Sequence, residues 1–289
     1  MPKLDATRLG QTIGPFHHTH RWQDVSLYAL ACGARADELD LVLEARGPAV
    51  LPSFLVVVQS DAFHQAMVDT GGELLMRLHG AQSFELHAPV PPEGTLSTSV
   101  TTRAYFDQGR GAIALFDGET VDDKGVLVAR STMEIFYRGH GGFGGEKRED
   151  PPSAVSELAS ARAPDLSFVD ETTPTQAQLY RLASGDANAV HLDPAVARKV
   201  GMPKPILHGM CTFSFATRAA IATLGGGAPS SLRNIAARFT RPVFPGETLT
   251  TELWRLDGGQ AALRTRSSTR GEVVLEGTCQ LDAPGIAYP

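Results

Sequence analysis

The segment GDANAVH holds the residues of this chain best suited to acid–base chemistry. Asp186, Asn188 and His191 follow Gly185, a residue that lets the backbone bend. An acid and an imidazole five positions apart do not face one another on an ideal helix, so a turn must bring them together. In such a turn they could hold one water molecule and exchange protons with it. The alternative is structural, with Asp186 capping a helix and His191 lying on the surface.

A second motif, PILHGMC at residues 205–211, favours the chemical interpretation. Gly209 is expected where an apolar helix begins, since residues 210–223 are apolar almost all round. The backbone N–H groups at a helix N-terminus have no partner within the helix, and the helix dipole favours negative charge there. An acid–base pair beside such a donor suffices to add water across a double bond conjugated to a thioester.

The chain contains one structural unit twice. Tyr28 matches Tyr180 at an offset of 152, and PVPPEGTLSTSV from Pro89 matches PVFPGETLTTEL from Pro242 at an offset of 153. Units of more than a hundred residues indicate a duplicated domain and not a solenoid. The first copy, YALACGARADELD, lacks the acid, the amide and the imidazole. One copy therefore has the residues for chemistry, and the other does not.

Each unit is expected to be α+β, with a central helix wrapped by an antiparallel sheet. The first unit spans residues 1–137, and the second spans residues 166–289. Between them, residues 138–165 are rich in Gly, Pro and charge, which predicts an exposed and partly mobile linker. Alternating patterns predict strands at 78–90, 95–107, 111–122, 126–138, 231–244, 247–256, 260–269 and 272–281.

Composition excludes several classes of protein. The 289 residues include 26 basic and 32 acidic side chains, a formal charge of −6, which argues against a nucleic-acid partner or a polybasic membrane anchor. The chain has no run of ~20 apolar residues, the length needed to span a bilayer, and the N-terminus lacks a secretory signal.

Three scattered cysteines suggest a reducing compartment, so we expect a cytoplasmic protein. The HHTH run at 17–20 is expected to be solvated surface and not a metal site.

Several ordered motifs resemble a known family. The stretch from Tyr180 to Ala197, with PILHG after it, resembles the hydratase 2 signature of the MaoC-like, (R)-specific enoyl-CoA hydratases. LHGAQ, HAPVPPEGTL and RGHGGFGG resemble the non-catalytic half of the double-hotdog hydratases. The likeness covers nearly the whole chain and implies a double hotdog fold. Two positions depart from the pattern: Ala189 replaces a usual Pro, and Gln108 replaces a Lys that contacts CoA in eukaryotic relatives.

The resemblance implies a lyase of fatty-acid or related acyl-CoA metabolism, including β-oxidation. A trans-2-enoyl-CoA would reversibly take up water to give a (3R)-3-hydroxyacyl-CoA. Asp186 and His191 would act on the water as acid and base, Asn188 would support their geometry, and the Gly209 N–H would bind the thioester oxygen.

The resemblance also implies how the substrate is held. Arg238 would meet the CoA phosphates, and His79 and Gly80 would contribute from the first unit. No metal or separate cofactor is expected, since the thioester and the oxyanion donor already polarise the alkene. The first unit would shape the acyl pocket and leave one active site per chain. Because the duplication builds a pseudo-dimer, either a monomer or a homodimer is feasible.

Two other functions compete with the hydratase. Hotdog thioesterases hydrolyse acyl-CoA with an acid on the central helix, but residues 210–223 contain no Asp or Glu. A non-catalytic acyl-CoA-binding protein is the third possibility. It would have no use for the pair Asp186 and His191 beside Gly209.

Overall fold

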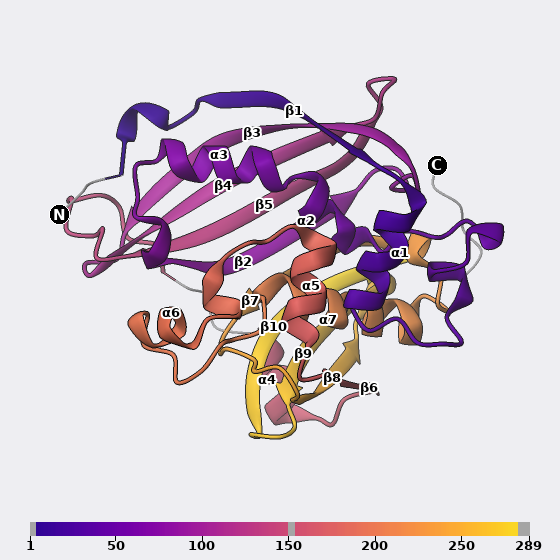
Figure 1. The fold of residues 1–289 in the computed structure, drawn as a ribbon. Coiled ribbons are helices and arrows are strands. Elements are labelled where there is room, and N and C mark those ends of the chain that lie inside the picture. The colour runs from indigo at the N-terminus through magenta and orange to yellow at the C-terminus, as the bar shows by residue number, and fades with distance from the viewer. Residues whose placement is uncertain (1–3, 150–153, 283–289) are drawn as a thin grey trace.

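The strands of the protein form one antiparallel sheet, shown by a computed structural model that describes residues 4–149 and 154–282 (Figure 1). The strand order is β1-β3-β4-β5-β2-β7-β10-β9-β8-β6, so the five strands of the second unit repeat those of the first in mirrored order. The strands are β1 (Thr12–His20), β2 (Arg77–Leu86), β3 (Gly94–Asp107), β4 (Gly111–Val121), β5 (Leu127–Arg138), β6 (Leu166–Glu171), β7 (Leu232–Phe239), β8 (Thr248–Arg255), β9 (Gln260–Ser267) and β10 (Glu272–Leu281).

Each half of the sheet packs against a central helical segment. In the second unit this is α7 (Gly209–Leu224), which is buried on nearly every side from Met210 to Ile221. In the first unit the segment is broken at Gln59 into α2 (Leu55–Val58) and α3 (Ser60–Asp69). The other helices are α1 (Trp22–Ala31), α4 (Ala154–Ala161), α5 (Gln176–Ser184) and α6 (Pro194–Lys199). This arrangement confirms the double hotdog fold predicted from the sequence.

Alternating burial within the strands explains why the sequence predicted most of them. In β3, for example, every second residue from Leu96 to Thr102 is buried, as expected for a strand with one face on the core. The edge strands β1 and β6 were not predicted. The expectation of a solvated HHTH segment holds for His17, which is exposed, but not for His20, which is 2% exposed; both belong to β1, which pairs with β3. His17 hydrogen-bonds Ser97, and the buried His20 hydrogen-bonds the carbonyl of Pro91.

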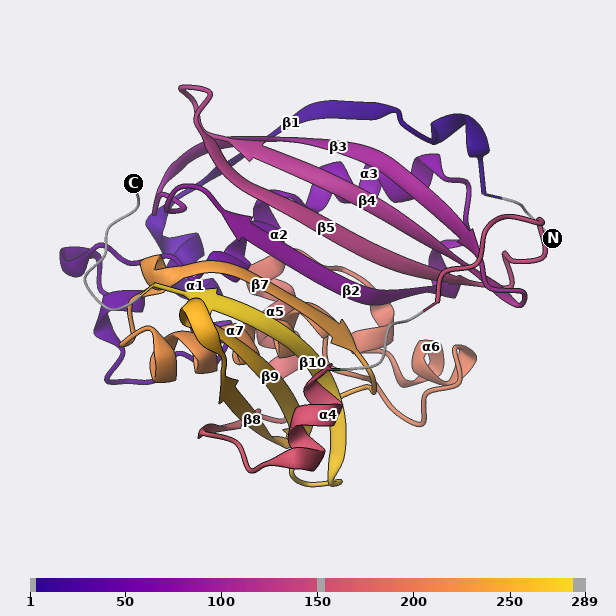
Figure 2. The same cartoon turned by 180° about the vertical axis from the view of Figure 1, so that it is seen from behind.

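The predicted linker contains more structure than an exposed connector. Asp107 at the end of β3 accepts backbone N–H bonds from Gly109, Gly142 and Gly144, which lower the pKa of its carboxyl to about 2. Helix α4 then packs on the outer face of the second half of the sheet (Figure 2). There Val155 and Trp254 share a small apolar cluster. Among the described residues no helix is both long and apolar enough to cross a membrane.

The two units are joined by backbone pairing and by a buried ion cluster. Strand β2 pairs with β7 along Ala81–Glu85. Arg218 is 1% exposed on α7, an exception to the apolar character predicted for that helix. Its guanidinium pairs with Asp170 of β6 and, at 2.6 Å, with Glu38 of the first unit. Arg35 adds a more exposed contact to Asp170.

Removing the buried guanidinium is expected to destabilise the fold. Arg218→Met leaves Asp170 and Glu38 facing an apolar side chain, which typically costs about 3–5 kcal/mol of unfolding free energy. Arg35→Met is the matched control, since an exposed pair is worth at most about 1 kcal/mol. Denaturant unfolding of both variants measures the difference. Equal unfolding free energies would show that the cluster does not hold the units together.

Candidate active site

A turn after α5 orients the carboxylate of Asp186. The helix ends at Gly185, whose φ of 75° and ψ of −2° place it in the left-handed region that glycine adopts without strain. The Asp186 N–H then donates to the Ser184 hydroxyl, and Asp186 Oδ1 accepts the N–H of Asn188 at 3.0 Å. This turn supplies the bend that the five-residue spacing required.

The next turn places His191 beside that carboxylate. Asn188 caps a short 3-10 turn, Ala189–His191, by accepting the N–H of Val190, so its carbonyl oxygen supports the loop as predicted. His191 is 8% exposed, and its Nδ1 lies 2.9 Å from the carbonyl oxygen of Ile206. Because a carbonyl can only accept, Nδ1 carries the hydrogen and Nε2 keeps its lone pair in the neutral ring. Burial lowers the pKa of His191, while the nearby Asp186 opposes the shift.

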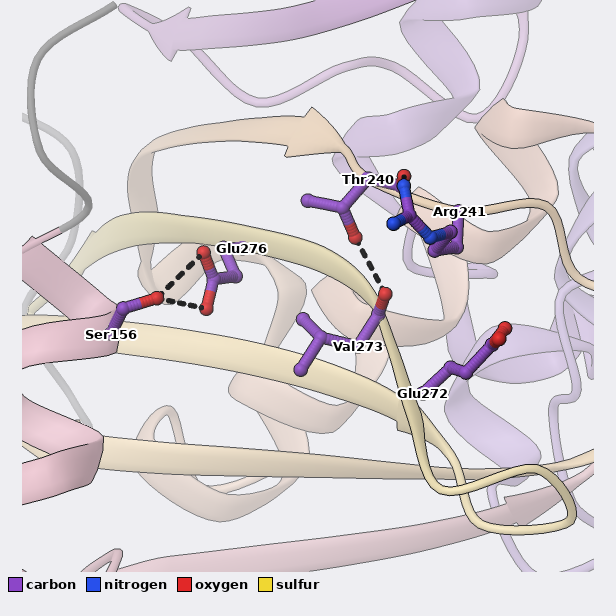
Figure 3. Close-up of a pocket in the computed structure, with 6 residues that line it drawn as sticks. All are labelled: Ser156, Thr240, Arg241, Glu272, Val273 and Glu276. Carbon is purple, nitrogen blue, oxygen red and sulfur yellow. Dashed lines mark hydrogen bonds between the residues drawn. The ribbon is translucent and has the colours of Figure 1, made fainter.

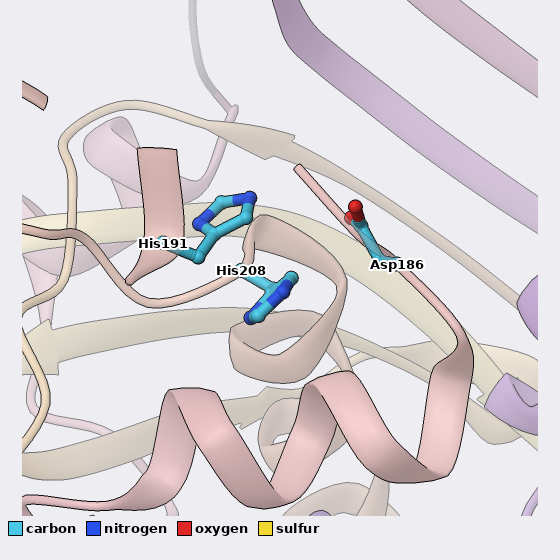
Figure 4. A group of neighbouring side chains, drawn as sticks. All are labelled: Asp186, His191 and His208. Carbon is cyan, nitrogen blue, oxygen red and sulfur yellow. The ribbon is translucent and has the colours of Figure 1, made fainter. Parts of the chain in front are cut away.

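His208 completes a cluster that sequence reasoning had not assigned to the chemistry. Its ring stacks on that of His191, with centroids 3.7 Å apart and planes 26° from parallel. One polar atom from each of Asp186, His191 and His208 lies within 4.8 Å of the other two (Figure 4). The sequence signal that could have identified it is the His directly before Gly209 in PILHGMC.

The same three residue types can bind zinc or iron. A metal ion needs the in-plane lone pairs of both imidazoles directed at one point. A water molecule needs only hydrogen-bond distances to the three polar atoms, which their mutual separation of at most 4.8 Å allows.

Gly209 is placed as predicted, at the first residue of α7 and directly after His208. Its backbone N–H has no acceptor available within the helix. A Cβ at this position would meet the Phe239 ring at 3.4 Å, so the glycine lies close beneath that aromatic side chain. The N–H of a helix start and the acid–base cluster are thus carried by adjacent residues of one chain segment.

His79 reaches this site from the first unit. Its ring contacts Phe239 edge to face at 5.0 Å, and burial lowers the pKa of His79 to about 4. A bulge between His79 and Ala81 interrupts the pairing of β2 with β5 and redirects the chain there. A Cβ on Gly80 would lie 2.8 Å from the Glu134 carboxylate, so the glycine makes room for that buried acid.

Arg238 is not brought to the cluster. It is exposed on β7, where alternation places it on the face opposite to Phe239 and Ala237. Beyond this strand a hollow of about 430 Å³ lies beside α4 (Figure 3). Its lining mixes Arg241 with Glu272 and Glu276 and includes no member of the Asp186 cluster.

Comparison with known proteins identifies the family. Residues 157–278 match the model of the MaoC like domain, and residues 16–139 match the MFE-2 hydratase 2 N-terminal domain. The 3-hydroxyacyl-thioester dehydratase Y of Mycobacterium tuberculosis is 39% identical over 99% of this chain and 98% of its own length. The chain belongs to the MaoC-like family. Among other relatives of this MaoC-like chain, the peroxisomal enoyl-CoA hydratase 2 of Arabidopsis thaliana is 34% identical over 93% of the chain and 92% of the relative.

A solved MaoC-like structure shows the same architecture. The MaoC-like dehydratase from Phytophthora capsici superposes with a TM-score of 0.84 at 27% identity, covering 99% of this chain and 100% of that one. Both units of the fold are therefore shared.

In this MaoC-like chain the first unit keeps the shape of the site without its chemical groups. Gly33, with φ 84°, follows the C-cap of α1, and Gly185 is itself the C-cap of α5. The matching 3-10 turn is Leu39–Leu41, whose buried last residue, Leu41, takes the place of His191. The first unit also lacks a free N–H at the start of its helix, because the Leu55 N–H already donates to carbonyls of the preceding Pro52–Phe54 turn.

A cavity of about 600 Å³ occupies the corresponding place in the first unit. It is lined by Leu86, Pro89 and Val90, which match Phe239, Pro242 and Val243 at an offset of 153. Its acids, such as Asp37 and Asp40, have no histidine beside them in that lining. The duplication has therefore preserved a second cleft that has no acid–base pair.

Proposed function

We propose that this chain catalyses the reversible hydration of a trans-2-enoyl-CoA to a (3R)-3-hydroxyacyl-CoA. The observation that carries the proposal is the convergence of Asp186 and His191 next to the N–H of Gly209. Such a site can activate water and stabilise an enolate oxygen together. The names of two relatives, an enoyl-CoA hydratase 2 and a 3-hydroxyacyl-thioester dehydratase, describe the two directions of this reaction.

The proposed mechanism conserves protons. The Asp186–His191 pair takes a proton from the water as its oxygen bonds to C3, and the alkene electrons move toward the thioester oxygen. The Gly209 N–H, helped by the start of α7, stabilises the negative charge on that oxygen. The pair then returns one proton to C2 and regains its starting state. CoA is part of the substrate, so the proposal includes no separate cofactor.

Loss of the conjugated enoyl-thioester absorbance tests this function directly. Purified protein mixed with trans-2-enoyl-CoA is expected to consume the chromophore, and chiral analysis of the product is expected to give the (3R) alcohol. Release of free CoA without hydration would instead support the thioesterase. That alternative is disfavoured because α7 carries no Asp or Glu. Binding without turnover would support the acyl-CoA-binding alternative.

One productive site per chain is a further expected result. The first unit lacks counterparts of Asp186 and His191, and the N–H at its helix start is occupied. Isothermal titration with a saturated acyl-CoA, which cannot be hydrated, is expected to give a stoichiometry of one ligand per chain. Two equivalent binding events would contradict an active site confined to the second unit.

A single chain, located in the cytoplasm, is the proposed catalytic unit. Because His79 of the first unit reaches Phe239 in the second, a single chain supplies both sides of the site, which supports a monomer as a competent unit. A homodimer of such chains is equally compatible with the proposal. The acyl group is proposed to lie toward the first unit, in cytoplasmic fatty-acid or related acyl-CoA metabolism, with no nucleic-acid partner.

A further inference from the structure

His208 is a buried histidine whose polar atoms are unsatisfied. It is 1% exposed, and both of its ring nitrogens lack a hydrogen-bond partner among the described residues. Leaving buried polar atoms unsatisfied is costly, and most such atoms in folded proteins are bonded to protein or to ordered water. We propose that His208 is a third residue that binds the reacting water, together with Asp186 and His191. This inference rests on the proposed hydration and adds a catalytic residue to it.

The spacing of the three side chains fits one water molecule. Their polar atoms lie within 4.8 Å of one another. For three atoms no more than 4.8 Å apart, there is always a point whose distance to each atom is at most about 2.8 Å, which is 4.8 divided by √3. That distance is an ordinary hydrogen-bond length. A single oxygen at that position contacts the carboxylate and both imidazoles at once.

The two histidines differ in what they can contribute. His191 has committed Nδ1 to the carbonyl of Ile206, so only Nε2 can face the water. The ring of His208 lies against the backbone of Asp186 without a well-formed hydrogen bond to either nitrogen, and the neutral ring offers one donor and one acceptor. As the water loses a proton to the Asp186–His191 pair, an N–H of His208 donates to the oxygen on which negative charge develops. His208 itself neither gains nor loses a proton in this step.

Packing holds the His208 ring in place for this role. One face stacks on His191, and Tyr180 packs against it with ring centroids 4.9 Å apart. The His208→Phe substitution keeps these ring contacts and removes both nitrogens. It therefore separates the effect of the nitrogens on catalysis from the effect of ring stacking.

The test compares His208→Phe and His208→Gln with the wild-type protein in the hydration assay. We expect His208→Phe to lower kcat about 100-fold, the scale seen when one preorganised donor is removed, with KM within about twofold. His208→Gln restores a side-chain donor and is expected to recover part of that loss. His64→Phe is the matched control, because His64 is an exposed histidine on α3 of the first unit, and this variant is expected to leave kcat unchanged.

The outcomes distinguish the inference from the function on which it rests. A kcat for His208→Phe within about threefold of wild type would overturn the role of the nitrogens and leave only stacking. Thermal unfolding of each variant shows whether it is folded. If His208→Phe does not fold, His208→Leu takes its place, since leucine also has no donor or acceptor. An unchanged kcat in that folded variant overturns the proposal, and a loss of kcat with little change in KM supports it. A wild-type protein that consumes no enoyl-CoA would instead refute the proposed function.

Discussion

Asp186→Asn and His191→Gln are each expected to lower kcat for enoyl-CoA hydration by about 10²–10⁴-fold, the range for loss of a positioned acid or base. Asn keeps the shape of Asp186 and an oxygen for the Asn188 N–H, but it cannot take up a proton. Gln likewise fills part of the space of His191 without a titratable nitrogen. The initial rate of absorbance loss at saturating substrate measures both effects.

A nearby acid provides the control for these two variants. Asp193 is exposed and caps α6 by accepting the N–H of Ala195, a role that Asn fills about equally well. Asp193→Asn is therefore expected to keep the wild-type rate. If Asp186→Asn and His191→Gln also retain that rate, the acid–base mechanism is refuted.

The pH profile follows from the direction of the pKa shift of His191. Burial lowers this pKa below its usual value of 6.5, so the ring stays neutral and able to accept a proton to a lower pH than an exposed histidine would. The acidic limb of kcat/KM is expected below pH 6.5, with activity lost as pH falls through the pKa of the folded state. An acidic limb well above pH 6.5 would show that a different group sets it.

Gly209→Pro is expected to have the second large effect, a loss of about 10²–10³ in kcat, the range measured for removal of one oxyanion donor. Proline removes the backbone N–H and places its ring carbon where the thioester oxygen would approach. The fold is expected to accept it, because proline is favoured at the first position of a helix. The preceding residue, His208, already has the φ of −57° and ψ of 134° that proline requires before it.

Gly209→Ala separates the effect of an added side chain from the effect of losing the backbone N–H. The added Cβ meets Phe239 at 3.4 Å, an ordinary contact distance, and the N–H is retained. This variant is expected to keep kcat within about tenfold of wild type, and thermal unfolding of both variants checks the fold. Equal activity of the proline and alanine variants would exclude the Gly209 N–H as the oxyanion donor.

The sequence predicted the larger part of the fold because its signals are periodic or repeated. Eight strands follow from alternation, and the duplication follows from motifs at a nearly constant offset. The edge strand β1 was missed because its burial alternates only weakly and just His20 is buried. The ion cluster of Arg218 was also missed. Its partners Asp170 and Glu38 lie 48 and 180 residues away in the chain, beyond any local pattern.

The local part of the site follows from residue type and spacing. Gly185 and the Asx turn at Asp186 act over two or three residues, so the sequence indicated that a turn could bring Asp186 and His191 together. The groups that surround this pair depend on tertiary packing. The stacking of His208 on His191 depends on how two loops pack, and strand pleating places Arg238 on the outer face. Local conformation follows from nearby residues, whereas contacts across the chain depend on which faces the whole fold buries together.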